Sequence, residues 1–183
     1  MSASVFRRVF ISRSVNYWHA CQRPASRGDA YPKSPRLTTS AVDDLDVVVA
    51  HSHAALGEFV NGDPEPFKQM WSQRDDVSLA NPYGPAVRGW EQVATAMDRA
   101  ATHYKAGEFI GYESVAKSQT QDLAYIVGIE RFTARIAGGE AVVPFALRVT
   151  SVFRMEVGAW RIVHRHADSI TTLQPDDSML RQS

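Results

Sequence analysis

Acidic residues and histidines lie close together in the last third of the sequence, where they could transfer protons. The candidate catalytic residues are Glu130, His166 and Asp168. A carboxylate beside an imidazole in an apolar pocket forms an acid–base pair, because such surroundings shift the pKa values of both groups. We therefore predict that Glu130 acts as the base, and that His166 orients it or acts as the acid.

These residues fall on predicted strands, whose pairing decides where each side chain points. Apolar and polar residues alternate over four segments, at 108–118, 123–136, 141–156 and 159–169. Turns at Gly138-Gly139 and Val157-Gly158 predict antiparallel hairpins. Pairing across both hairpins places one polar set on the apolar, inner face, comprising Glu130, Ser151, His164, His166 and Asp168. Glu130 and Asp168 then flank Leu147 at about 9–10 Å, a gap that could hold a substrate or a water molecule.

Further residues are predicted to contact a substrate, namely Asn81, Tyr83, Trp71, Ser151 and His164. Asn81 and Tyr83 lie in a turn that follows a predicted strand at 76–80, from which they would polarise a substrate oxygen. The alternative is structural. Buried polar groups usually satisfy one another, and large aromatic residues such as Trp71 usually belong to the core.

Helices precede these strands. Apolar residues recur at helical spacing from Leu45 to Phe59, after a capping pattern at Ser40–Asp43. A short helix follows Asp63-Pro64, and a third runs from Trp90 towards Gly107. This order predicts an α+β domain, with three N-terminal helices packed against a strongly curved antiparallel sheet that forms a cone with an internal pocket.

The first forty residues differ from the rest of the chain. The 183 residues carry no net charge, yet residues 1–40 hold seven basic residues and one acidic residue. We predict that 1–40 is an extension outside the fold, either a mitochondrial transit peptide or a start assigned too far upstream, so a cytoplasmic and a mitochondrial location both stay open. The domain itself is predicted to span 41–169, followed by a tail at 170–183.

Composition excludes several classes of protein. No apolar run approaches the roughly 18 residues that a membrane span needs. The single cysteine, Cys21, excludes an internal disulfide framework. The predicted domain has no basic face for nucleic acid. Because no phosphate-binding glycine loop or nucleophile elbow is present, we expect no cofactor.

The order of elements, the turn Asn81-Pro82-Tyr83-Gly84 and the final strand Trp160-Arg161-Ile162-Val163-His164-Arg165-His166 resemble the SnoaL-like and ketosteroid-isomerase-like superfamily. The resemblance covers residues 43–169 and implies the cone-shaped fold that nuclear transport factor two also uses. Ketosteroid isomerases need a carboxylate base where this chain has Asn81, and their oxyanion-hole residues would fall near Leu56 and Ser151. The resemblance therefore does not imply steroid isomerisation by that mechanism. His164, His166 and Asp168 have the spacing of metal ligands, but this family ending commonly occurs without metal, so we predict none.

Two functions stay open after this reasoning. In the first, a homodimer formed through the sheet binds a small, largely apolar molecule in its cone and catalyses cofactor-free isomerisation, hydration or cyclisation. In the second, the domain is a non-catalytic module for ligand sensing or oligomerisation, because every ketosteroid-isomerase role is missing and no substitute triad is present.

Overall fold

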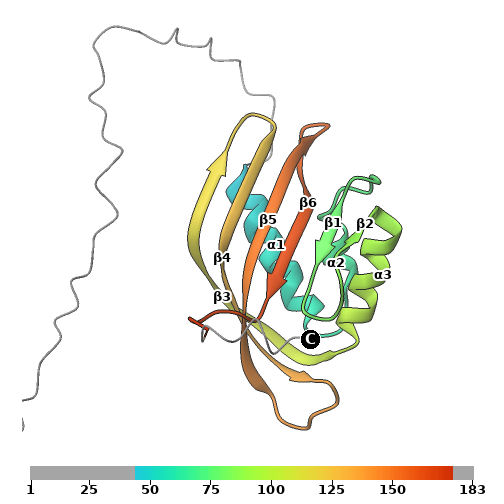
Figure 1. Ribbon diagram of the computed structural model, residues 1–183, viewed down its shortest axis with the longest axis vertical. Coiled ribbons are helices and arrows are strands. Elements are labelled where there is room, and N and C mark those ends of the chain that lie inside the picture. The colour runs from blue at the N-terminus through green and yellow to red at the C-terminus, as the bar shows by residue number, and fades with distance from the viewer. Residues whose placement is uncertain (1–43, 175–183) are drawn as a thin grey trace, which may run out of the picture. The chain divides into compact units, whose positions relative to one another are not determined.

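The computed structural model describes residues 44–174, which form an α+β domain (Figure 1). Its elements, in chain order, are α1 (Leu45–Phe59), α2 (Glu65–Lys68), β1 (Ser78–Ala80), β2 (Val87–Arg88), α3 (Trp90–Ala101), β3 (Tyr104–Gln119), β4 (Leu123–Ile136), β5 (Val143–Glu156) and β6 (Ala159–Asp168). The predicted α+β class is confirmed. The predicted extension at 1–40, the capping pattern at Ser40–Asp43 and the end of the predicted tail lie outside the described residues.

Helix α1 begins where a side chain satisfies its free amide groups. The Asp44 carboxylate accepts a hydrogen bond from the Asp46 backbone N–H at 3.0 Å, which is the usual role of an N-cap residue. The helix ends before Gly62, whose φ of 98° suits a residue without a side chain. Its buried residues share one side, which faces the sheet, and are Leu45, Val48, Ser52, Ala55 and Leu56.

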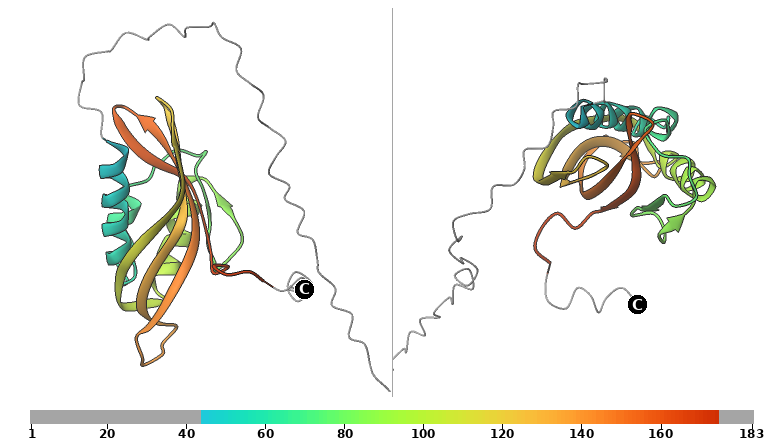
Figure 2. Two further views of the ribbon diagram at one scale, coloured as in Figure 1. Left: turned by 90° about the vertical axis from the view of Figure 1, so that its left-hand side faces the viewer. Right: turned by 90° about the horizontal axis from the view of Figure 1, so that it is seen from above.

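The six strands form one sheet in the order β2-β1-β6-β5-β4-β3. β1 runs parallel to β6, and the other neighbouring strands are antiparallel. The long strands bend together, and α1 lies against the concave side of the sheet (Figure 2). The curvature has a local cause in β3, whose pairing with β4 shifts register at three places, because each such bulge bends a strand.

The first predicted hairpin register is confirmed and the second is wrong. Glu130 pairs with Leu147, as the Gly138-Gly139 turn predicts. In the second hairpin Phe153 pairs with Ile162, but Val152 then pairs with His164. Val163 is the extra residue of a β-bulge, and a slip of a single residue turns every later side chain to the opposite face.

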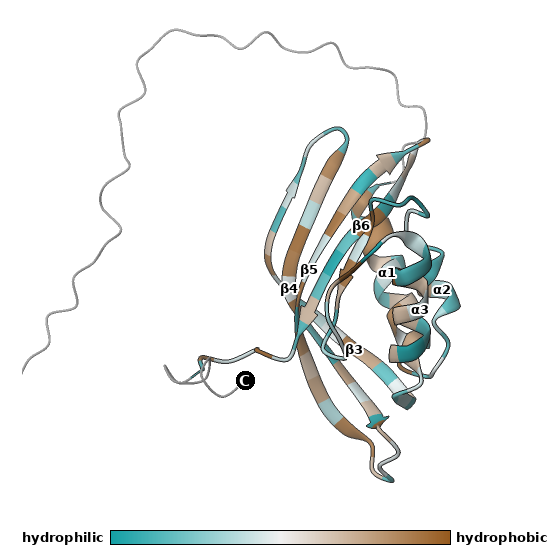
Figure 3. Cartoon of the chain, turned by 45° about the vertical axis from the view of Figure 1, so that its right-hand side comes forward, coloured by the Kyte–Doolittle hydropathy of each residue, from teal (hydrophilic) through white to brown (hydrophobic). Residues whose placement is uncertain are grey.

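The core fills the space between the helices and the inner face of the sheet. Its largest fully buried apolar side chains include Phe153, Leu45, Met97 and Ile162. Burying such side chains contributes about 1.5–3 kcal/mol each. Hydrophobic and hydrophilic residues alternate along the long strands in Figure 3, as expected for a sheet that buries one face. Within residues 44–174, no helix is long and apolar enough to cross a membrane.

Candidate functional site

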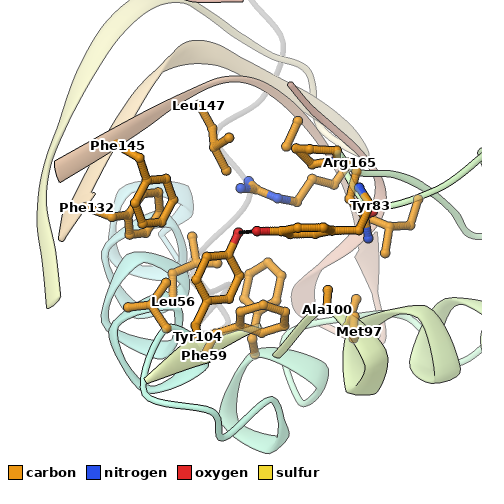
Figure 4. A pocket seen from close by; sticks show the side chains of 16 residues that line it. Leu56, Phe59, Tyr83, Met97, Ala100, Tyr104, Phe132, Phe145, Leu147 and Arg165 are labelled. Atoms are coloured by element: carbon orange, nitrogen blue, oxygen red, sulfur yellow. Dashed lines mark hydrogen bonds between the residues drawn. The ribbon is translucent and has the colours of Figure 1, made fainter. Parts of the chain in front are cut away.

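A cavity of about 60 Å³ lies between the helices and the inner face of the sheet. Most of the side chains around it are apolar (Figure 4), and they come from α1, α2, α3 and the inner faces of β1 and β3–β6. Four polar residues join the lining, namely Asn81, Tyr83, Tyr104 and Arg165. An apolar hollow with a few convergent polar groups is the usual form of a small-molecule site.

Arg165 forms a buried ion pair with Glu130. The exposed fraction of Arg165 is 5% and that of Glu130 is 1%. The two guanidinium nitrogens Nη1 and Nη2 donate to the two carboxylate oxygens at 2.9 and 2.6 Å, and Nη1 also donates to the Ser151 hydroxyl at 3.3 Å. Such a bidentate pair combines strong hydrogen bonds with a fixed geometry.

This ion pair changes what Glu130 can do. Both of its oxygens already accept hydrogen bonds from a cation, so proton uptake by Glu130 would break the pair. Glu130 is not among the residues that line the cavity, whereas Arg165 is. The role of Glu130 as a base stays a prediction, and the residue that binds both of its oxygens, Arg165, is the one that lines the cavity.

Two tyrosine hydroxyls meet inside the cavity. The Tyr83 hydroxyl donates to the Tyr104 oxygen at 2.9 Å, and the guanidinium of Arg165 lies above this pair (Figure 4). Burial, together with the hydrogen bond from Tyr83, raises the pKa of Tyr104 above its ordinary value of 10.0. Tyr104 therefore keeps its proton at neutral pH and presents an O–H donor.

The cavity donors suit a ligand oxygen better than a metal ion. A guanidinium carries N–H donors and no lone pair for a metal, and a protonated phenol is a poor metal ligand. Of the five N–H groups of Arg165, three make the bonds described above to Glu130 and Ser151. The other two N–H groups have no hydrogen-bond partner among residues 44–174, and Arg165 and Tyr104 both line the cavity.

The predicted substrate-binding residues are divided between the cavity and the core. Asn81 and Tyr83 line the cavity, but the Asn81 side-chain oxygen already accepts from the Tyr83 backbone N–H at 2.9 Å. Ser151 is buried beside Arg165. Trp71 is buried in the core, where its ring packs edge-on against Phe67, and it does not line the cavity.

His164, His166 and Asp168 lie on the outer face of the sheet, so their predicted position inside the cone is wrong. The bulge at Val163 is the cause, since it exchanges the inner and outer faces of the rest of β6. His164 Nδ1 lies 2.9 Å from the Ser78 hydroxyl of the neighbouring strand β1. Asp168 accepts two hydrogen bonds from Arg148, and the His166 side chain is 51% exposed.

Sequence reasoning missed Arg165 and His53. Arg165 had a detectable signal, because a carboxylate placed inside an apolar core needs a cation or a donor nearby. His53 on α1 directs Nε2 towards the buried pair, 3.9 Å from Glu130 Oε1, and its ring stacks on Phe109. Burial lowers the pKa of His53, although the Glu130 charge opposes this shift.

Comparison with known families matches residues 48–171 to the model of a SnoaL-like domain. The chain belongs to this family. This SnoaL-like chain has no match among curated proteins. It is also similar to several solved structures. Their sequence identity to this chain is low, so the likeness shows a shared fold and nothing about activity.

One similar structure is a putative dehydratase from the NTF2-like family of Streptomyces avermitilis, with 21% identity, a TM-score of 0.59, and coverage of 72% of this chain and 96% of that one. A second is a nuclear transport factor 2-like superfamily protein from Salmonella enterica, with 18% identity, a TM-score of 0.60, and coverage of 74% and 99%. A third is a ketosteroid isomerase-like protein from Erwinia carotovora atroseptica, with 17% identity, a TM-score of 0.59, and coverage of 74% and 100%. The resemblance inferred from the turn and the final strand is confirmed.

Proposed function

We propose that the cavity binds a small, uncharged and largely apolar molecule through one acceptor oxygen, such as that of a ketone. The observation that carries this proposal is the convergence of the Arg165 guanidinium and the Tyr104 hydroxyl on an otherwise apolar cavity. Apolar contacts supply most of the binding free energy, and the donors orient the ligand.

The charge of the site supports an uncharged ligand. Arg165 and Glu130 neutralise each other inside the domain. An anionic ligand would bring a second buried negative charge to the same guanidinium, at a large cost in desolvation. A neutral carbonyl oxygen accepts hydrogen bonds from the free donors without this cost.

The size of the cavity supports a compact ligand. A volume of about 60 Å³ accommodates roughly four to six water-sized groups. A five-membered ring bearing one oxygen has about this size.

A binding role is favoured over catalysis by the choice of side chains. The donors would also stabilise negative charge on a ligand oxygen, as an enolising enzyme requires. Such an enzyme also needs a base beside the ligand, and among residues 44–174 no carboxylate or imidazole lines the cavity. We therefore propose a ligand-binding module, and turnover of a ketone by the wild-type chain would contradict this part of the proposal.

A ligand pair that differs in one oxygen tests the proposal. Cyclopentanone and cyclopentane are titrated into the full chain and followed by NMR, and we expect the ketone to bind more tightly. Tyr104→Phe removes one donor and should weaken ketone binding roughly fivefold, with little effect on cyclopentane. Tyr125→Phe, at a tyrosine that is 42% exposed, is the matched control. Equal affinity of the wild-type chain for both compounds would refute the proposal.

We further propose that the chain forms a homodimer through the outer face of the sheet. Tyr125 on β4 is exposed there beside its partner Val152 on β5, so an apolar strip is available for a second copy. Light scattering should give twice the mass of one chain, and Tyr125→Glu should reduce it to that of one chain. A wild-type monomer at high concentration would exclude the dimer.

A further inference from the structure

A second hollow lies outside the cavity, where β3 begins and β4 ends. It is a groove of about 520 Å³, lined by Thr102, His103, Lys105, Arg135, Gly138, Gly139 and Glu140. The residues around the start of β3 form one side, and the end of β4 with the β4–β5 turn forms the other. No residue lines both the groove and the cavity, so the groove is a separate feature.

Two cations lie next to each other in this groove. Lys105 and Arg135 are direct partners in the β3–β4 ladder, and both are exposed. Like charges at directly opposite positions destabilise a sheet. Within the part of the chain that the structure describes, neither cation forms an ion pair.

The arrangement contrasts with other arginines of the same sheet. Arg131, Arg148 and Arg154 each contact a carboxylate, at 2.9, 2.7 and 2.6 Å respectively. These three arginines each have a counter-ion, whereas Lys105 and Arg135 have none among the ion pairs of residues 44–174. An anion bound between or beside the two charges would relieve their repulsion.

The other lining residues leave room for an anion. His103 adds a third side chain with a nitrogen donor, and its ring stacks on Tyr83 with the centroids 4.4 Å apart, which restrains it. Gly138 and Gly139 bring no side chain into the groove. Glu140 is the carboxylate among the lining residues, so Lys105 and Arg135 leave a net charge of +1 even when His103 is neutral.

We propose that this groove is a binding site for a small oxyanion, a phosphate or carboxylate group. A guanidinium, an ammonium and an imidazole together provide charge-assisted hydrogen bonds to its oxygens. The bound anion would also remove the repulsion between Lys105 and Arg135. The oxyanion could be free in solution or part of an organic molecule, and the site does not depend on what the apolar cavity binds.

The test is a titration of the full chain with inorganic phosphate at constant ionic strength, followed through backbone amide resonances. We expect saturable shifts at His103, Lys105 and Gly139. The double variant Lys105→Gln/Arg135→Gln should weaken binding roughly tenfold or more, because it removes two attractive charges. His103→Gln, which leaves both charges in place, should weaken it by a smaller factor.

The control removes two charges from other positions of the sheet, where each cation contacts a carboxylate. Lys117→Gln/Arg131→Gln takes away cations that contact Asp46 and Glu113, and it should leave phosphate affinity unchanged within about twofold. Shifts that never saturate, or an equal loss of affinity in the control, would overturn the proposal, because they would report non-specific attraction.

Hexyl phosphate distinguishes the two sources of the oxyanion. Tighter binding than inorganic phosphate, with shifts that extend to Tyr83, would support the site as one for the anionic group of an organic molecule. Equal affinity for both compounds would support it as a site for the free ion. Absence of saturable binding by either compound would overturn it.

Discussion

Replacing one member of the Glu130–Arg165 ion pair should destabilise the fold severely, whereas replacing both together should cost much less. Both side chains are almost fully buried and joined by two hydrogen bonds of 2.6 and 2.9 Å. In Glu130→Leu the guanidinium keeps its charge but retains only the Ser151 hydroxyl as a hydrogen-bond partner in that cluster. In Arg165→Met the carboxylate loses both donors. Each single variant leaves an uncompensated charge inside the domain.

The magnitude follows from this desolvated charge. Breaking a buried pair by removing one partner costs about 3–5 kcal/mol of the free energy of unfolding. The double variant Glu130→Leu/Arg165→Met leaves no buried charge and fills a similar volume, so it should cost no more than about 2 kcal/mol. Adding the costs of the single variants would predict about 6–10 kcal/mol, so the coupling between the two positions should be at least about 4 kcal/mol.

Urea denaturation at pH 7, followed by circular dichroism, measures the free energy of unfolding of each variant. Since a domain is stable by only about 5–15 kcal/mol, a single variant could be unfolded. Glu130→Gln, which keeps an acceptor for Arg165, should lose about 1–3 kcal/mol and remain measurable. The matched control is Arg131→Met, at an exposed pair with Glu113, where the loss should stay below about 1 kcal/mol. Additive costs in the double variant would refute this account of the ion pair.

Three further predictions concern single residues. Burial lowers the pKa of His53 in the fold, so stability is complete above the ordinary pKa of 6.5 and falls as the pH drops below it, by at most about 1.4 kcal/mol per pH unit. Urea titrations of His53→Phe should show a smaller slope, and an unchanged slope would contradict this. Gly128→Ala would place a Cβ 2.4 Å from the Glu113 carbonyl oxygen and from the Tyr112 ring, so we expect a loss of about 1–3 kcal/mol in the same assay, and a neutral effect would show that β3 moves freely. His166→Ala changes an exposed side chain, so stability should stay within about 0.5 kcal/mol and ketone binding should be unchanged; a large loss of either would return His166 to the site.

Local patterns were sufficient for much of the fold. The periodicity from Leu45 to Phe59 predicted α1, although its N-cap is Asp44 and the capping pattern at Ser40–Asp43 lies outside the described residues; the alternation over 123–136 predicted β4. The α+β class followed from the order of helices and strands. The short strand β2 was not predicted, since Val87 and Arg88 are too few residues to show a period.

The candidate site was only partly predictable. The Gly138-Gly139 turn set the first hairpin register, and that register correctly placed Glu130 on the inner face. The partner of Glu130 was not predicted, because Arg165 stood on the outer face in a regular pairing of β5 with β6. Adjacent apolar residues at Ile162 and Val163 interrupt the alternation, and this interruption was the available signal of a bulge.

By itself the sequence determined most of the helices and strands, although α3 ends at Ala101 and β3 begins at Tyr104 rather than after Gly107, and it determined that a carboxylate at position 130 faces the core. These properties depend on neighbours a few residues apart, which the chain brings together in any compact fold. Only the tertiary structure decided that Arg165, rather than His166, faces Glu130. The pairing of β5 with β6 can accept or omit an extra residue, and burial of a charged group favours the register that supplies its counter-ion.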